Sequence, residues 1–178
     1  MKRKICTLAL VIPLIFTISF SQKKQTPVAG VESSIPATQV IKNVPVAANI
    51  TLTADEKQMV ALVNKARIQN KVPPLKVDMQ VTNVARIKAQ EMITKKYFSH
   101  TSPKYGSPFA MLKSFGVRYV AAGENIAGNS NVANAQSSLM KSPGHRKNIL
   151  NPAYNYVGIG IKNGGPYGKM ISQMFIKK

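Results

Sequence analysis

The sequence contains one cysteine, no tryptophan, two histidines and only six acidic residues. The cysteine is Cys6, which lies near the amino end within the first apolar run. If the chain is cut after Ser21, no cysteine remains, so disulfide bonds contribute nothing to stability and the hydrophobic core must supply it. The roughly 125 residues that follow position 50 are enough for such a core. Any metal or acid–base site must be built from very few side chains.

Negative charge is scarce, because 25 Lys and Arg stand against six Asp and Glu and the formal net charge is +19. Without Lys2, Arg3 and Lys4, 22 basic and six acidic residues remain, a net charge near +16. This excess favours anionic partners over long range. For an exported protein the candidates are anionic cell-wall polymers and lipid headgroups, and the alternative is a solvated basic surface with no specific partner. Nucleic-acid binding is not predicted, because no nucleic-acid motif occurs and aromatic residues are not interleaved with Lys and Arg.

The first 50 residues divide into two predicted segments. A basic start, an apolar run over 5–20 and the small-residue exit Ser19-Phe20-Ser21 predict a secretory signal peptide at residues 1–21. The alternative is an uncleaved anchor, but the run is shorter than the roughly 20 residues that span a bilayer and Pro13 interrupts it, so no stable membrane span is expected after cleavage. Residues 22–50 have three prolines and no aromatic residue, which predicts a disordered linker.

Residues 51–178 are predicted to form one folded domain. A capping box at 53–56 starts a helix, and a second helix runs from near Asp78 to about Lys96 with Lys88 and Glu91 off its apolar stripe. Shorter helices are predicted at 109–115, 131–140 and 145–150, a strand at 117–121, and a hairpin from the alternating residues at 157–161 and 170–176. Helices followed by late strands predict an α+β domain with helices packed on an antiparallel sheet.

Three polar side chains are candidates for a shared site. His100 follows a Tyr-Phe-Ser run, His145 follows Pro-Gly, and Glu124 is the one acid between two glycine-rich turns rather than on a helix surface. Two imidazoles and a carboxylate can hold a divalent metal such as zinc, or form a His–Glu hydrogen bond that tunes a proton donor. The sequence intervals between these three residues match no metal-ligand spacing rule, so separate structural roles stay open. His100 would then interact with a helix dipole, His145 would cap or pack near a helix start, and Glu124 would bond backbone amides of its turn.

Several motifs occur in an order that resembles the bacterial branch of the CAP superfamily, the SCP-like extracellular proteins. This superfamily includes the cysteine-rich secretory, antigen five and pathogenesis-related proteins. The resemblance spans about residues 53–177. The motifs are Tyr-Phe-Ser-His at 97–100, Tyr-Gly-Ser-Pro-Phe at 105–109, Ala-Gly-Glu-Asn-Ile-Ala at 122–127, Ser-Pro-Gly-His-Arg-Lys-Asn-Ile-Leu at 142–150, Val-Gly-Ile-Gly at 157–160 and Gln-Met-Phe at 173–175.

The resemblance implies a three-layer α-β-α sandwich with a central antiparallel sheet and a ligand cleft. The cleft residues it implies here are His100, Glu124, Asn125, Ser142 and His145, with His100, Glu124 and His145 as metal ligands. The family's second acid falls near Ser142, and a serine cannot replace a carboxylate as a base or as a strong ligand. A Ser142–His145 nucleophile pair lacks any oxyanion-hole context in the sequence.

These features predict a secreted protein, extracellular and associated with the cell wall or spore surface, that acts as a binding module. Its cleft would take a metal, a lipid or a wall component. One alternative is a metal-assisted hydrolase or peptidase that uses the same residues. Another is an assembly or adhesion protein of the spore or envelope. A shared fold does not by itself choose among these functions.

Overall fold

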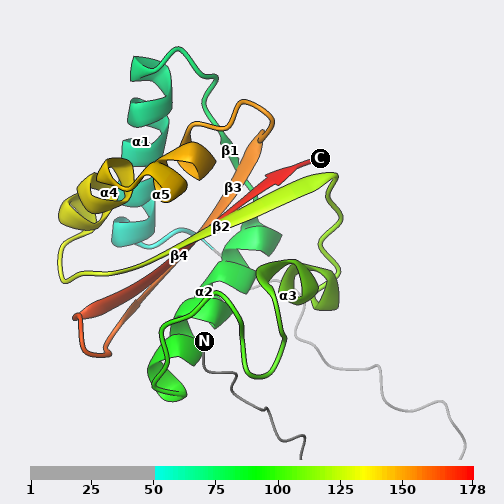
Figure 1. Cartoon of the computed structure of the whole chain (residues 1–178), viewed down its shortest axis with the longest axis vertical. Coiled ribbons are helices and arrows are strands. Elements are labelled where there is room, and N and C mark those ends of the chain that lie inside the picture. Colours follow the sequence, from blue (N-terminus) through cyan, green and yellow to red (C-terminus); the bar gives the residue numbers. More distant parts are fainter. Residues whose placement is uncertain (1–50) are drawn as a thin grey trace, which may run out of the picture. The chain divides into compact units, whose positions relative to one another are not determined.

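The computed structural model describes residues 51–178 (Figure 1), so the predicted signal peptide and linker lie outside the described residues. The described part is an α+β domain, as predicted. Its elements in chain order are α1 (Ala54–Gln69), β1 (Lys76–Val77), α2 (Met79–Thr94), α3 (Pro108–Ser114), β2 (Ala121–Gly128), α4 (Val132–Lys141), α5 (Pro143–Ile149), β3 (Tyr156–Asn163) and β4 (Lys169–Lys177).

The four strands form one sheet in the order β1-β3-β4-β2. Strand β4 pairs antiparallel with β3 on one side and with β2 on the other, so the three long strands form the predicted antiparallel sheet. The two residues of β1 add a short parallel edge beside β3. Each helix within residues 51–178 is too short or too polar to span a lipid bilayer.

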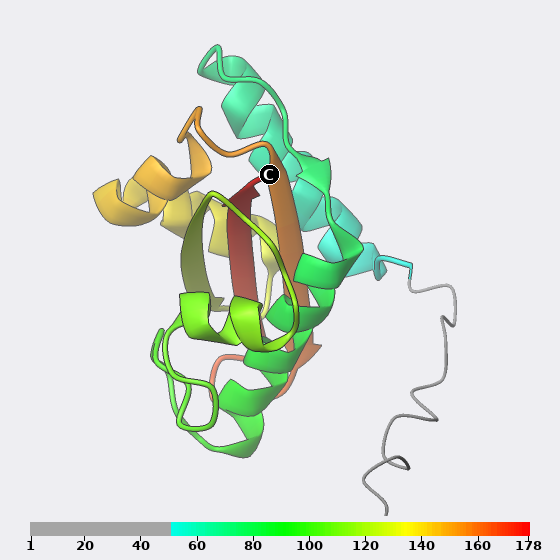
Figure 2. The ribbon, with the colours of Figure 1, turned by 90° about the vertical axis from the view of Figure 1, so that its right-hand side faces the viewer.

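Helices cover both faces of the sheet and give the expected three layers (Figures 1 and 2). Helices α2 and α3 pack on one face, and α1, α4 and α5 pack on the other. The core is correspondingly split, because alternate residues of a strand face opposite sides of the sheet. Val157, Ile159 and Phe175 face α1 and its neighbours, while Met174 and Ile176 face α2 and α3.

The helices begin where the local sequence satisfies their free amide groups. The Thr53 hydroxyl accepts a hydrogen bond from the Glu56 amide, and the Glu56 carboxylate accepts one from the Thr53 amide, which confirms the capping box. Asp78 caps α2, and Ser107 caps α3 with Pro108 at the first helical position. These local signals set the places where the chain enters each layer.

Two glycines bring α2 unusually near to β3. A Cβ atom added to Gly158 would lie 2.3 Å from the Val81 backbone, and one added to Gly160 would lie 2.1 Å from the Ala85 backbone. Real side chains cannot approach backbone atoms this closely, so only glycine permits this helix-to-strand distance. The Val-Gly-Ile-Gly alternation therefore fixes how deeply α2 lies on the sheet.

Strand β2 differs from the sequence-based expectation. The sequence predicted a strand at 117–121 followed by a turn around Glu124, but β2 begins at Ala121 and Glu124 lies in its middle. The strand pairs continuously with β4, from Ala121 opposite Lys177 to Gly128 opposite Met170. Pairing along the whole strand outweighs the local turn preference of the glycines, because the backbone groups of β2 that face β4 gain hydrogen-bond partners.

Candidate functional site

His100 and Glu124, two of the three candidates from the sequence, form a direct pair. His100 lies in the segment between α2 and α3, and its Nδ1 lies 2.9 Å from the Glu124 Oε2. The Glu124 side chain is 2% exposed, whereas the His100 side chain is 51% exposed. Because the Ser172 hydroxyl donates to the other Glu124 oxygen at 3.1 Å, a buried and fixed carboxylate orients a half-exposed imidazole.

A buried polar network lies around this pair and was not predicted. Lys88 is 0% exposed and Glu91 is 8% exposed, although the apolar pattern of α2 predicted that both lie off its buried stripe. Lys88 Nζ donates to the Tyr97 hydroxyl at 3.1 Å and to the His100 carbonyl oxygen at 2.9 Å. The Tyr97 hydroxyl donates to Glu91 at 2.6 Å, and the Ser102 hydroxyl donates to the other Glu91 oxygen at 3.0 Å.

Burial and charge shift the proton affinities in this network. Burial lowers the pKa of Lys88, and the carboxylates of Glu124 and Glu91 partly oppose that change. Burial also raises the pKa of Tyr97, and its hydrogen bond to Glu91 adds to the rise because it stabilises the protonated hydroxyl. The Tyr97 hydroxyl therefore stays protonated at physiological pH and continues to donate to Glu91.

The spacing of α2 contained a signal that would have found Lys88. Lys88 lies three positions after Ala85 and four before Met92, and both of those side chains are fully buried. Residues three and four apart lie on the same side of a helix, so the position belongs to the buried stripe. The charge of the side chain concealed this. Ser172 had no comparable signal, because it meets Glu124 only through the pairing of β2 with β4.

The imidazole of His145 contacts a hydroxyl group rather than a carboxylate. It lies on α5, and its Nδ1 is 2.8 Å from the Ser142 hydroxyl oxygen. Its backbone carbonyl oxygen accepts a hydrogen bond from the Asn125 amide at 3.1 Å. Burial lowers the pKa of His145, and the neighbouring His100 lowers it further through charge repulsion. The Ser142–His145 contact thus ties the start of α5 to its own third residue.

Asn125 is fully buried and its amide is used inside the domain. Its Nδ2 donates to the Gln173 Oε1 at 3.0 Å, and its Oδ1 accepts from the Asn148 amide at 2.9 Å. The Asn148 amide also donates to the Glu124 carbonyl oxygen. The residue adjacent to Glu124 therefore connects β2 to β4 and to α5, the helix that carries His145.

The predicted zinc ligands do not form a single group as they stand. Among residues 51–178, no three side chains of His, Cys, Asp or Glu are close enough together to hold a metal ion. The Nδ1 atoms of both histidines are engaged, one with Glu124 and the other with Ser142. The Nε2 atoms remain the nitrogens that could face a ligand. The zinc site stays a prediction.

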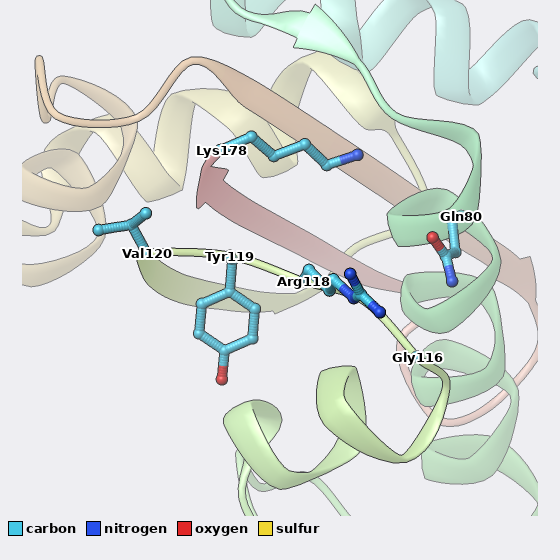
Figure 3. Close-up of a pocket in the computed structure, with 6 residues that line it drawn as sticks. All are labelled: Gln80, Gly116, Arg118, Tyr119, Val120 and Lys178. Carbon is cyan, nitrogen blue, oxygen red and sulfur yellow. The ribbon is translucent and has the colours of Figure 1, made fainter.

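Two surface cavities lie elsewhere on the described domain. One has a volume of about 620 Å³ and lies between the end of α2 and the β3–β4 turn. The other has a volume of about 530 Å³ and is lined by Gln80, Gly116, Arg118, Tyr119, Val120 and Lys178 (Figure 3). Neither is lined by His100, Glu124 or His145. The His100–Glu124 pair lies outside both of these cavities, and its imidazole is half exposed.

Known proteins resemble this chain in sequence and in fold. The family described as "Cysteine-rich secretory protein family", CAP, matches residues 60–175. YkwD of Bacillus subtilis, an uncharacterized protein, is 43% identical over 147 residues, which cover 82% of this chain and 56% of YkwD. The chain therefore spans about half the length of this curated relative.

Two solved structures show the same fold. An extracellular protein with an SCP domain from Bacillus anthracis is 33% identical with a TM-score of 0.64, over 72% of this chain and 45% of that one. An outer surface protein of Borrelia burgdorferi is 16% identical with a TM-score of 0.66, over 72% of this chain and 96% of that one. The family match spans residues 60–175 and so includes His100, Glu124 and His145. This chain belongs to the CAP family of cysteine-rich secretory proteins.

Proposed function

We propose that this protein is an extracellular binding module that attaches to anionic polymers of the bacterial envelope. The observation that supports the proposal is the large excess of basic over acidic residues in the described domain. Residues 51–178 contain nineteen Lys and Arg against five Asp and Glu. Each of the five carboxylates has a partner within the domain, so little negative charge is left to balance the surface.

The partners of these carboxylates leave most of the basic residues without an acidic neighbour. Asp55 pairs with Lys169, Glu56 with Arg86, and Asp78 with Lys178. The exposed basic residues without a carboxylate partner are spread over the domain: Lys57, Lys65, Lys71, Lys76, Lys95, Lys96, Lys104, Lys113, Arg118, Lys141, Arg146, Lys147 and Lys177. Such a surface attracts a polyanion from a distance and holds it through many weak contacts.

An extracellular location supports the choice of partner. The similar Bacillus anthracis protein, which is 33% identical to this chain, is an extracellular protein. A basic protein outside a bacterial cell meets anionic wall polymers and lipid headgroups at high local concentration. Phosphate groups that repeat along a polymer match a surface whose charges are distributed rather than gathered at one point.

Cosedimentation with purified cell walls tests this function. The wild-type protein should bind walls at low ionic strength and lose most binding between about 50 and 500 mM NaCl, because salt screens charges over a Debye length of about 14 to 4 Å. Walls stripped of their phosphate polymers should bind less. The variant K104E/K113E/K147E should bind more weakly, whereas His100→Ala should bind like wild type. Salt-independent binding, or equal binding to stripped walls, would refute the proposal.

A metal-assisted hydrolase is the second candidate, and the His100–Glu124 pair favours it. A half-exposed imidazole oriented by a buried carboxylate is a common arrangement for a metal ligand or a proton-transfer residue. The test is metal analysis of the purified protein together with a proteomic substrate screen. Cleavage that disappears in both His100→Ala and His145→Ala would support a hydrolase. Cleavage that both variants retain would exclude these residues as its basis.

A further inference from the structure

Lys88 is a fully buried cation in the middle of α2, and it contacts the segment that carries His100. It is 0% exposed, and apolar side chains lie before and after it on the same helix face, among them Val84, Ala85 and Met92. Its ammonium lies 4.8 Å from the centre of the Tyr97 ring and donates to the Tyr97 hydroxyl. It also donates to the carbonyl oxygen of His100.

The hydrogen bonds of Lys88 restrain the segment between α2 and α3 at two points. Tyr97 is the first and the His100 carbonyl is the second, and only two residues lie between them. Because Lys88 donates to the backbone carbonyl of His100, it fixes the backbone from which the imidazole extends, and this restricts the directions in which the imidazole can point. Glu91 supports the arrangement from the same helix, because it accepts hydrogen bonds from Tyr97 and from Ser102.

A lysine is a costly choice at this buried position. Removing an ammonium group from water costs several kcal/mol, which its hydrogen bonds and the nearby carboxylates of Glu124 and Glu91 must offset. Both sides of Lys88 on α2 are lined by apolar core. A methionine would fill this space without a buried charge, but it could donate no hydrogen bond to the His100 carbonyl.

We propose that Lys88 is a positioning residue, which holds the His100 carbonyl so that the imidazole faces Glu124. This role goes beyond attachment to envelope polymers, because it concerns one side chain and requires no ligand. It predicts a specific state of the imidazole. When neutral His100 faces the Glu124 carboxylate, Nδ1 must carry the proton, because two acceptors cannot share a hydrogen bond. An imidazole released from Glu124 distributes its proton between both nitrogens.

Nitrogen-15 NMR of the histidine rings distinguishes the two tautomers directly. Spectra of the folded protein at about pH 9, where an ordinary histidine is neutral, should show the Nδ1–H form of His100 as the dominant species. In Lys88→Met this dominance should be lost, with both tautomers populated. A folded Lys88→Met protein that keeps the Nδ1–H form would overturn the proposal. If the variant unfolds in buffer, the spectra are recorded in trimethylamine N-oxide, which favours compact states.

Two further variants separate positioning from general loss of stability. Val63→Ala creates a cavity in the core on the opposite face of the sheet and should lower stability while the His100 tautomer stays unchanged. Tyr97→Phe removes one acceptor of Lys88 but leaves the His100 carbonyl contact, so the Nδ1–H form should persist. A mixed tautomer in Tyr97→Phe would assign the positioning to Tyr97 and overturn the role of Lys88, whether or not Lys88→Met folds.

Discussion

Single buried charges in this domain are compensated by neighbours from other elements. Arg67 of α1 is 0% exposed and donates four hydrogen bonds to the carbonyl oxygens of Pro73, Ile149, Asn151 and Tyr154. It joins the end of α1 to the end of α5 and to the segment before β3. Because a buried charge without partners is costly, these contacts fix the positions of the loops that supply them.

The buried carboxylate of Glu56 makes the stability of the domain depend on pH. Burial alone would raise the pKa of Glu56, but the hydrogen bonds from Arg86 and from the Thr53 amide outweigh it and lower the pKa below the ordinary value. The unfolded chain therefore binds a proton at higher pH than the folded domain does. The stabilisation by ionised Glu56 is present above about pH 4.5, the ordinary value, and is lost as the pH falls through the lowered folded pKa.

We expect Glu56→Gln to lower the free energy of unfolding by about 3 kcal/mol at pH 7, because Arg86 is left with an incomplete partner. The loss should shrink as the pH falls from about 5 to 3. Urea unfolding followed by circular dichroism over this pH series measures both effects. Asp55→Asn breaks the more exposed pair with Lys169 and should cost about 0.5 kcal/mol. An equal loss in both variants would contradict the assigned role of Glu56.

Among the elements, the contact between α2 and β3 carries the strictest geometric requirement. A Cβ atom at Gly160 would lie 2.1 Å from the backbone of α2, where no flexible side chain can give way. We expect Gly160→Ala to destabilise the domain by about 3 kcal/mol or more, since the helix must move off the sheet. Gly144→Ala in α5 is the matched control, because its Cβ meets nothing within 4 Å. Urea unfolding of both variants should therefore separate them clearly.

Gly144→Ala should leave stability unchanged or raise it by up to about 1 kcal/mol, because alanine is the better helix former. If both variants lost similar stability, the close approach of α2 to β3 would not be the reason for glycine in the Val-Gly-Ile-Gly alternation. The conformational freedom of glycine would then be the explanation. Movement of α2 would also displace Lys88, so Gly160→Ala should loosen His100 as well. The packing of one element thus extends to the candidate site.

The same elements show what sequence can and cannot predict. The helix starts at Thr53, Asp78 and Ser107 follow from side chains that cap the next few amides, so local sequence is sufficient. The sequence-based prediction misplaced strand β2, because the bounds of this strand are set by its pairing with β4, which lies far along the chain. The family resemblance implied that His100 and Glu124 share a cleft, whereas the roles of Ser172 and Lys88 depend on tertiary packing that motifs do not describe.

At the scale of the whole domain, the excess of positive charge opposes folding while it favours anionic partners. Residues 51–178 carry fourteen more basic than acidic residues, nineteen against five, and compaction brings these charges together. The three Lys or Arg ion pairs with carboxylates act in the other direction. Repulsion among the many unpaired charges should dominate, because exposed ion pairs contribute little individually.

Added salt should therefore stabilise the isolated domain. We expect the melting temperature to rise by a few degrees between about 20 and 200 mM NaCl, because the Debye length shortens from about 22 to 7 Å over this range. Differential scanning calorimetry measures the shift. The K104E/K113E/K147E variant lowers the charge excess and should show a smaller rise. A melting temperature that falls with salt would mean that ion pairs such as Glu56–Arg86 outweigh the repulsion among the unpaired charges.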